Sequence, residues 1–371
     1  MALVTAGVVY GITGGHWRAA FGPSSRPWWP SHSLLRPTWP SSSPCEARKS
    51  VSRSPLSGVI ALAYKPPPRP PPQGRREIAF PPHKGEGDRV RVDVALILPA
   101  YAKLNLTLDV TGRRPDGYHE IDSVMQTISL HDLLWIERTD CRVFDLVGTP
   151  IDGENLVLKA ARELEGRVSR NLPFTLRLFK RIPMGAGLGG GSADAAAFLR
   201  AANQLYDLKL TSTELVEVAT NVGQDVPFFL SGGTARATGL GSTLEPLLPF
   251  PASWRFLVVC PPVAISTRSV YAAVDGTEPT AHRTPALVRA LANENAIEFG
   301  NDLEGTSRRL FAALDEAIEP LRAAVPGMAM TGTGAAFFAG FQDQRDAEKA
   351  LATVRRLAYP AWLCHPVAAA S

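Results

Sequence analysis

The sequence predicts a mixed α/β protein of about two folded domains. Its 371 residues are enough for about two domains of roughly 100–200 residues each. From about residue 90 onward, period-2 and period-3.6 apolar patterns alternate, which indicates strands interleaved with helices. The 45% hydrophobic and 20% charged residues are ordinary for a globular protein. No apolar run approaches the roughly 18 residues of a membrane helix, and the four cysteines lie too far apart to suggest a disulfide scaffold or a metal knot.

Residues 1–92 form an N-terminal extension that we expect to be disordered. Residues 1–85 hold 15 of the 32 prolines, with no helical or alternating apolar pattern. Such a segment cannot bury enough apolar surface to offset the entropy lost on ordering. Two interpretations stay open: a stretch translated from a wrongly chosen start, which leaves a cytoplasmic protein, or a transit peptide to an organelle such as a plastid.

The basic charge of the chain belongs to this extension. Residues 1–85 hold 11 Lys and Arg against two acidic residues, whereas residues 86–371 hold 28 against 33. The basic balance is therefore no argument for nucleic-acid binding by the folded part.

Strand patterns dominate the beginning of the folded part. Leu104, Leu106, Leu108 and Val110 alternate with polar residues, which predicts a half-buried strand. Turn residues then interrupt the pattern. The patterns that follow predict strands at 121–130, 133–138 and 174–179, with a helix at 155–164.

Helical patterns follow the last of these strands. One apolar stripe predicts a helix from Ser192 to about Tyr206. A second helix begins at Thr211, where Glu214 completes a capping box, and ends at Gly223. A proline-rich stretch near residues 245–253 suggests a boundary, so we expect domains at 93–248 and 249–371. In the latter, the patterns predict strands at 256–260 and 337–338, helices at 307–323 and 343–357, and a glycine-rich turn at 331–334.

A glycine-rich loop lies between a predicted strand and a predicted helix. Five of the seven residues 185–191 are glycine, so a ligand can approach bare backbone, and the helix points free N–H groups at the loop. This combination is suited to phosphate, whereas a purely structural turn would need only one glycine. The spacing Gly185-x-Gly187-x-x-Gly190 also matches the dinucleotide fingerprint, but a second helix follows instead of a strand. No lysine completes a Walker motif.

Three groups of polar residues are candidates for chemistry. Lys103 and Asn105 project from one face of the first strand, either as site residues or as part of a solvated sheet face. Asp225 precedes an apolar run, as a functional acid or as a cap or salt-bridged residue. Tyr118 and His119 follow a tight turn, where they bind a ligand or are simply exposed. With the loop, these residues suggest phosphoryl transfer, in which a cation steadies the transferred group and a carboxylate receives the hydroxyl proton.

Together these segments resemble the GHMP kinases, the superfamily of galactokinase and of homoserine, mevalonate and phosphomevalonate kinases. The resemblance covers about residues 98–338 and is carried by Ala102-Lys103-Leu104-Asn105-Leu106 with Arg114-Pro115-Asp116-Gly117-Tyr118-His119, Pro183–Ala193, Gly223-Gln224-Asp225-Val226-Pro227-Phe228-Phe229 and Thr331-Gly332-Thr333-Gly334-Ala335. It implies a two-domain α/β kinase fold. Residues 93–248 would form an ATP-binding domain similar to domain 2 of ribosomal protein S5, and residues 249–371 a ferredoxin-like domain. The Lys-x-Asn and Asp-Gly-Tyr-His segments are most similar to the members that phosphorylate the 2-hydroxyl of a cytidyl-diphospho-methylerythritol in the non-mevalonate route to isoprenoids.

The resemblance also implies a role for each candidate residue. Asp225 would be the catalytic base, and Lys103 would hold it and the acceptor hydroxyl in place. Asn105 would contact the substrate, while Tyr118, His119 and Tyr271 would surround its cytosine. Lys180 would lie near the nucleotide. The phosphates of ATP would lie on Pro183, Met184, Gly185, Ala186, Gly187, Leu188, Gly189, Gly190, Gly191, Ser192 and Ala193.

Partners and alternatives complete these expectations. Mg²⁺ would accompany ATP, although the sequence contains no recognisable carboxylate cage for a metal site of its own. We expect a monomer or homodimer without nucleic-acid or membrane partners. The alternatives are another GHMP small-molecule kinase of the homoserine or mevalonate type, a non-catalytic nucleotide-binding module and, last, a dinucleotide-dependent oxidoreductase.

Overall fold

A computed structural model of the chain describes residues 93–148, 154–274, 282–293 and 297–369, together with the backbone of short strands before residue 65. The chain divides into two compact units, Met1–Glu46 and Ala47–Ser371. The first contains an antiparallel sheet of β1 (Leu3–Thr5), β2 (Val8–Thr13) and β3 (His16–Ala20), and the second includes β4 (Val51–Ser52) and β5 (Ile60–Tyr64). The other residues of the 1–92 extension lie outside the described residues, so its disorder stays a prediction.

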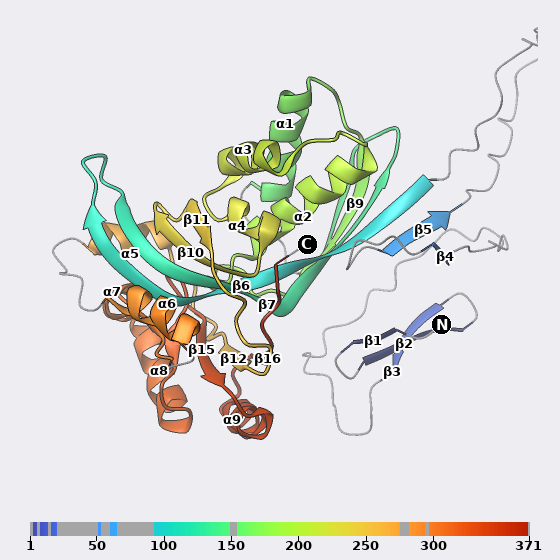
Figure 1. Ribbon diagram of the computed structural model, residues 1–371. Coiled ribbons are helices and arrows are strands. Elements are labelled where there is room, and N and C mark those ends of the chain that lie inside the picture. Colours follow the sequence, from blue (N-terminus) through green and yellow to red (C-terminus); the bar gives the residue numbers. More distant parts are fainter. Residues whose placement is uncertain are drawn as a thin grey trace, which may run out of the picture. The chain divides into compact units, whose positions relative to one another are not determined.

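A nine-stranded sheet is the centre of the second unit. Two long strands, β6 (Asp93–Arg113) and β7 (His119–Arg138), form an antiparallel hairpin (Figure 1). The strands predicted at 121–130 and 133–138 are one strand, because His131 and Asp132 between them stay paired with β6. The sheet order is β11-β10-β7-β6-β5-β4, with β9 also on β7 and β8 on β9. The added strands are β8 (Val143–Val147), β9 (Phe174–Phe179), β10 (Thr234–Gly239) and β11 (Thr243–Pro246).

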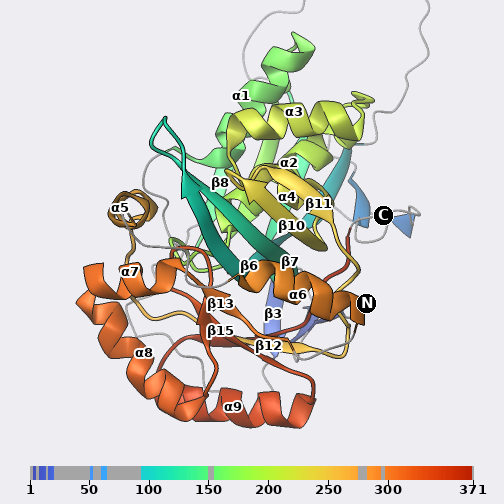
Figure 2. The same ribbon diagram turned by 60° about the vertical axis from the view of Figure 1, so that its left-hand side comes forward.

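Helices cover one face of this sheet (Figures 1 and 2). They are α1 (Leu156–Val168), α2 (Gly190–Leu205), α3 (Ser212–Val222) and α4 (Val226–Ser231). Helix α2 contacts the hairpin directly, and the other three pack against α2. It starts at Gly190, two residues before the predicted Ser192. The predicted capping box of α3 is confirmed, since the side chain of Thr211 accepts from the N–H of Glu214 and the Glu214 carboxylate accepts from that of Thr211.

A smaller antiparallel sheet lies on the other side of the hairpin (Figure 1). Its order is β14-β15-β12-β16, formed by β12 (Arg255–Val259), β14 (Ala329–Met330), β15 (Phe337–Phe341) and β16 (Ala361–Cys364). Both of its faces are buried. Phe256 and Phe338 share an apolar cluster with Leu104 of β6, whereas Leu257 and Phe337 share another with the helices beyond. The two-sheet arrangement confirms the predicted mixed α/β fold.

The second half of the chain adds helices beside the smaller sheet and beside the hairpin. They are α5 (Thr267–Ala273), α6 (Arg283–Asn293), α7 (Leu303–Leu310), α8 (Ala312–Ala324) and α9 (Gln344–Arg356). Helices α5 and α6 were not predicted. The prediction of one helix at 307–323 is wrong, because the backbone leaves the helical region at Phe311 (φ −125°, ψ 87°), which ends α7 and precedes α8.

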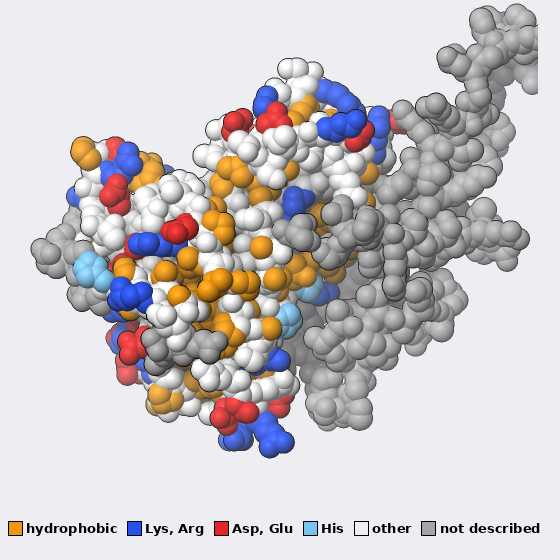
Figure 3. Space-filling model, in the orientation of Figure 1, with side chains coloured by type: hydrophobic (Ala, Val, Ile, Leu, Met, Phe, Trp, Pro, Cys, Tyr) orange, Lys and Arg blue, Asp and Glu red, His pale blue; other side chains and the backbone are white. Residues whose placement is uncertain are grey.

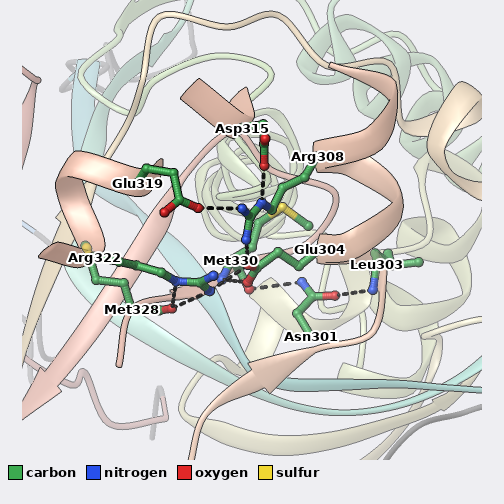
Figure 4. A network of polar contacts seen from close by, with 9 residues as sticks. All are labelled: Asn301, Leu303, Glu304, Arg308, Asp315, Glu319, Arg322, Met328 and Met330. Atoms are coloured by element: carbon green, nitrogen blue, oxygen red, sulfur yellow. Dashed lines mark hydrogen bonds and ion pairs between the residues drawn. The ribbon is translucent and has the colours of Figure 1, made fainter. Parts of the chain in front are cut away.

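Ion pairs join α7 and α8 across this break (Figure 4). Arg308 of α7 donates to Asp315 of α8 at 2.5 Å, and Arg322 of α8 donates back to Glu304 of α7 at 2.6 Å. Because the pairs run in both directions, they hold the two helices at a defined angle in place of the continuous helix expected from the pattern.

The two halves of the folded part interlock. Strand β13 (Gly300–Asn301) pairs in parallel with β6, and α6 lies along β6 and β7 (Figure 2), although both come after residue 248. All strands of the smaller sheet follow the predicted boundary at 248/249, but so does β13 of the larger sheet, and the boundary stays a prediction as a domain limit. Apolar side chains gather on the face where β10, β6 and α6 lie in Figure 1 (Figure 3). Among the described helices, none has the length and apolar character needed to span a membrane.

A buried charge cluster anchors the start of the glycine loop. Lys180, which follows β9, donates to Asp132 of β7 and, at 2.6 Å, to Asp194 of α2. Asp132 also accepts from the backbone N–H groups of Arg181 and Ile182. Burial would lower the pKa of Lys180, but Asp194 and Asp132 outweigh it and raise that pKa. Burial raises the pKa of Asp194 to about 8, with Lys180 opposing and Asp132 reinforcing the shift.

The raised pKa of Asp194 predicts that stability decreases with pH. Folded Asp194 keeps its proton up to about pH 8, whereas an unfolded aspartate loses it near pH ~4. The free energy of unfolding should therefore fall as pH rises through this window, by up to about 1.4 kcal/mol per pH unit from this group. Urea unfolding between about pH 5 and 8 should show a flatter dependence for Asp194→Asn than for the wild type.

A matched control is Asp207→Asn, whose side chain is 81% exposed. It should keep the wild-type pH dependence. If Asp194→Asn also kept it, the buried carboxyl would not be the proton-binding group.

Candidate active site

The glycine loop, residues 183–193, is anchored to the core by buried side chains and borders open space at Gly185. The side chains of Ala186 and Leu188 are buried, which presses the loop onto the core. Gly185, Gly187 and Gly189 have φ values of 64°, 75° and 71°, a region that favours glycine. Since α2 already begins at Gly190, the free N–H groups of its first turn lie at the end of the loop.

Two of these glycines permit close contacts between segments. A Cβ at Gly187 would lie 2.3 Å from the carbonyl oxygen of Thr331, and one at Gly189 would lie 2.5 Å from Cζ of Phe229 in α4. Gly185 has no other atom within 4 Å of such a Cβ. Some glycines of the loop are therefore required by packing, while Gly185 borders open space that a ligand can enter.

Lys103 and Asn105 are both 4% exposed, so the solvated-face interpretation of this strand is wrong. The ammonium of Lys103 donates to Oδ1 of Asn105, and its backbone N–H donates to the carbonyl of Leu188 in the loop at 3.0 Å. The backbone N–H of Asn105 donates to Oγ1 of Thr331, in the second half of the chain, at 2.9 Å. A Cβ on Gly332 would be 3.5 Å from Nζ of Lys103. The strand, the loop and the 331–334 turn thus meet at Lys103.

Irregular pairing of β6 with β7 places these side chains. The register shifts between Tyr101 and Lys103, and again between Asn105 and Thr107. Such bulges insert an extra residue and turn side chains away from strict alternation. Lys103 and Asn105 therefore lie between two bulges, which an alternating pattern in the sequence does not reveal.

Asp225 stands immediately before α4, and its carboxylate does not cap that helix. It occupies the N-cap position but makes no side-chain cap bond, which removes the cap interpretation. Burial lowers the pKa of Lys103 while the charge of Asp225 opposes this shift. Burial, and then Asp225, raise the pKa of Tyr271 well above its usual range. Asp225 therefore acts electrostatically on Lys103 and on Tyr271, which the sequence places 122 and 46 residues away.

Of the three residues predicted to surround the cytosine, the structure brings His119 and Tyr271 together but leaves Tyr118 exposed. The rings of His119, at the start of β7, and Tyr271, in α5, lie 5.8 Å apart between centroids at an angle of 32°. Tyr118 is 59% exposed on the turn between β6 and β7, so no packing holds it against that pair. Lys180 is packed against the loop, since a Cβ on Gly190 would be 3.3 Å from its Nζ. Its ammonium is buried and bound by Asp132 and Asp194, so it does not face open space.

Two residues of this region received no role from the sequence. Thr331 is fully buried and holds the backbone of Asn105, and Phe229 packs over Gly189. Both lie in segments that carry the kinase resemblance, and this resemblance was the only sign in the sequence that they belong to the site. Their roles depend on contacts with residues more than 30 positions away, so no local pattern assigns them.

Comparisons with known proteins agree with this geometry. Residues 155–233 match the family described as GHMP kinases N terminal domain. The 4-diphosphocytidyl-2-C-methyl-D-erythritol kinase of Carboxydothermus hydrogenoformans is 36% identical over 263 residues, 68% of this chain and 91% of the relative. The kinase of the same name from Pelotomaculum thermopropionicum is 40% identical over 267 residues, 69% of this chain and 93% of the relative.

Solved structures give the same result for the fold. A crystal structure of 4-(cytidine 5′-diphospho)-2C-methyl-D-erythritol kinase has a TM-score of 0.63 at 36% identity, covering 73% of this chain and 98% of its own. A homoserine kinase from Cytophaga hutchinsonii has a TM-score of 0.57 at 15% identity, covering 78% and 98%, and shows the shared fold only. The predicted GHMP kinase fold is confirmed. With relatives this similar over nearly their whole length, the chain belongs to the family of 4-diphosphocytidyl-2-C-methyl-D-erythritol kinases.

Proposed function

We propose that this protein transfers the γ-phosphoryl group of ATP to the 2-hydroxyl of 4-diphosphocytidyl-2-C-methyl-D-erythritol. The observation that supports the proposal is the buried Lys103 ammonium, whose backbone N–H is bonded to the open glycine loop and whose pKa the charge of Asp225 shifts upward against burial. The substrate is the one named for relatives that are 36–40% identical. Homoserine and mevalonate kinases share the fold at only about 15% identity.

The phosphates of ATP would lie along residues 183–193. The backbone N–H groups at the start of α2 and its positive dipole end favour an anion there. Open space at Gly185 admits the phosphates to the backbone. Because the Lys180 charge is already bound by Asp132 and Asp194, it supports the loop and is not a direct phosphate ligand in this proposal.

Phosphoryl transfer would proceed between Lys103 and Asp225. The substrate oxygen forms a bond to the γ-phosphorus while the bond from that phosphorus to the β-bridging oxygen breaks, and ADP leaves. Asp225 receives the hydroxyl proton, and the Lys103 ammonium orients the attacking oxygen and stabilises charge on the transferred group. The buried setting of Lys103 strengthens these electrostatic effects.

The cytosine would stack on the pair formed by His119 and Tyr271. Their rings already lie within the usual distance of an aromatic pair, so the base would stack against the pair and not between its members. Tyr118, which is exposed on the turn before His119, would contact the base from that side. Asn105 would contact the substrate through the second lone pair of Oδ1 or the second N–H of Nδ2, because Lys103 and Ser123 each occupy one of these.

Mg²⁺ would accompany ATP and neutralise charge on its phosphates. Within the described ranges, no group of three or more His, Cys, Asp or Glu side chains could hold a metal ion. The residues therefore fit an ion bound mainly by phosphate oxygens and water, with at most one or two protein ligands.

Asp225→Asn should abolish turnover while the protein stays folded. The amide cannot accept the hydroxyl proton, so kcat should fall by about a hundredfold or more. The KM for ATP should change little, because the loop is untouched. ADP release with ATP and the cytidyl substrate, measured by a coupled assay, tests this.

The exposed variant Asp207→Asn serves again as control and should turn over like the wild type. Wild-type turnover in Asp225→Asn, with native circular dichroism, would refute the assignment of the base.

Tyr271→Ala should weaken binding of the cytidyl substrate specifically. Loss of a stacking ring costs about 1–3 kcal/mol per base, so the KM for this substrate should rise about tenfold or more. Tyr271→Phe keeps the ring and should retain a KM close to that of the wild type. Steady-state kinetics with each substrate varied in turn separates the effects, and an equal change in the KM for ATP would argue against base recognition at this ring.

A further inference from the structure

Ser123 lies beside the proposed catalytic lysine without touching it. This β7 residue is fully buried, and in the sheet it pairs with Leu108 of β6 and Ala237 of β10. Its hydroxyl reaches the side chain of Asn105, whose other amide atom faces Lys103. Ser123 is therefore the second link in a buried chain that ends at the Lys103 ammonium.

The direction of each hydrogen bond in this chain is determined. Oγ of Ser123 donates to the carbonyl oxygen of Thr107 at 2.6 Å. A serine hydroxyl has one proton, so Ser123 can only accept from the Asn105 amide, whose Nδ2 lies 2.8 Å away. With Nδ2 directed at Ser123, the amide must direct Oδ1 at Lys103, whose ammonium can only donate.

The backbone leaves this arrangement little freedom. The bulge between Asn105 and Thr107 brings the Thr107 carbonyl to the Ser123 hydroxyl. The N–H of Asn105 is held by Thr331. If the hydroxyl were absent, Nδ2 of Asn105 would be a buried donor without this partner, and the amide would lose one of the two contacts that hold its plane.

We propose that Ser123 is a positioning residue for phosphoryl transfer, which acts by fixing the Asn105 amide so that its oxygen holds the Lys103 ammonium. This inference rests on the role proposed for Lys103 above. It does not require Ser123 to contact either substrate, and it explains why a polar side chain occupies a fully buried position in the central strand.

Ser123→Ala should lower kcat more than it changes binding. A displaced ammonium should reduce kcat by about tenfold to a hundredfold, while the KM for ATP stays within about twofold. The alkaline limb of the kcat–pH profile should also move to lower pH. Burial already lowers the pKa of Lys103, and the loss of a fixed acceptor favours the neutral amine further.

The other titratable groups near this ammonium stay in place in the variant. Asp225 acts on it from the turn before α4, and Asp225 acts also on Tyr271, whose ring pairs with that of His119. A shift of the alkaline limb can therefore be assigned to Lys103, since Ser123→Ala leaves these three side chains unchanged.

Thr107→Val is the matched control. Thr107 is also fully buried, and its hydroxyl bonds the Val124 N–H and the Thr284 hydroxyl, not the Asn105 amide. The variant loses a buried hydroxyl at the same bulge while its backbone carbonyl still accepts from Ser123. It should lose stability but keep the wild-type kcat per folded molecule and the wild-type alkaline limb.

The outcomes separate this inference from the proposed function. If Ser123→Ala behaves like Thr107→Val while Asp225→Asn is inactive, the positioning role of Ser123 is overturned and the proposed function stands. An active Asp225→Asn overturns the proposed function itself. If Ser123→Ala does not fold, Ser123→Cys keeps the volume but is a weak acceptor, and the same changes in kcat and in the alkaline limb are expected of it.

Discussion

The burial of the Lys103 ammonium is the constraint on which the rest of the site depends. An isolated charge is costly in a protein interior, so such a group needs polar partners on several sides. Asn105 provides an amide oxygen from the same strand, and Asp225 provides the opposite charge from the turn before α4. Gly332, from the second half of the chain, lies next to the ammonium, since a Cβ there would be 3.5 Å from Nζ of Lys103. Positioning this one group therefore requires both halves of the fold.

The two buried lysines have different partners, which accords with the different roles proposed for them. Lys180 has two aspartate side chains in direct contact, Asp132 and Asp194, and their influence outweighs burial and raises its pKa. Lys103 has a neutral amide in contact and a carboxylate acting on it electrostatically, so burial prevails and its pKa is lowered. Lys180 is thus a permanent cation that anchors the loop. The ammonium of Lys103 donates to the neutral amide of Asn105, so in the proposed reaction its charge would stabilise the negative charge that develops on the transferred group.

The glycine loop belongs to both sheets. Its residues follow β9 of the large sheet, yet the Ala186 carbonyl accepts from the N–H of Ala336, beside β15 of the small one, at 3.2 Å. Gly187 packs directly on Thr331. A phosphate chain on this loop would therefore rest on a surface that neither sheet forms alone.

Local patterns determined much of this protein. Alternation identified strands such as Phe174–Phe179, the capping box located α3 at Thr211, and the glycine-rich loop pointed to phosphate chemistry. These signals are readable because each depends on residues within a few positions of one another. Only the tertiary structure decided that Lys103 is buried between two bulges, that Asp225 acts on it, and that the helix expected around Ser307 breaks at Phe311. The reason is physical: these features arise from pairing register and from contacts between distant segments, and such contacts leave no periodic trace in the chain.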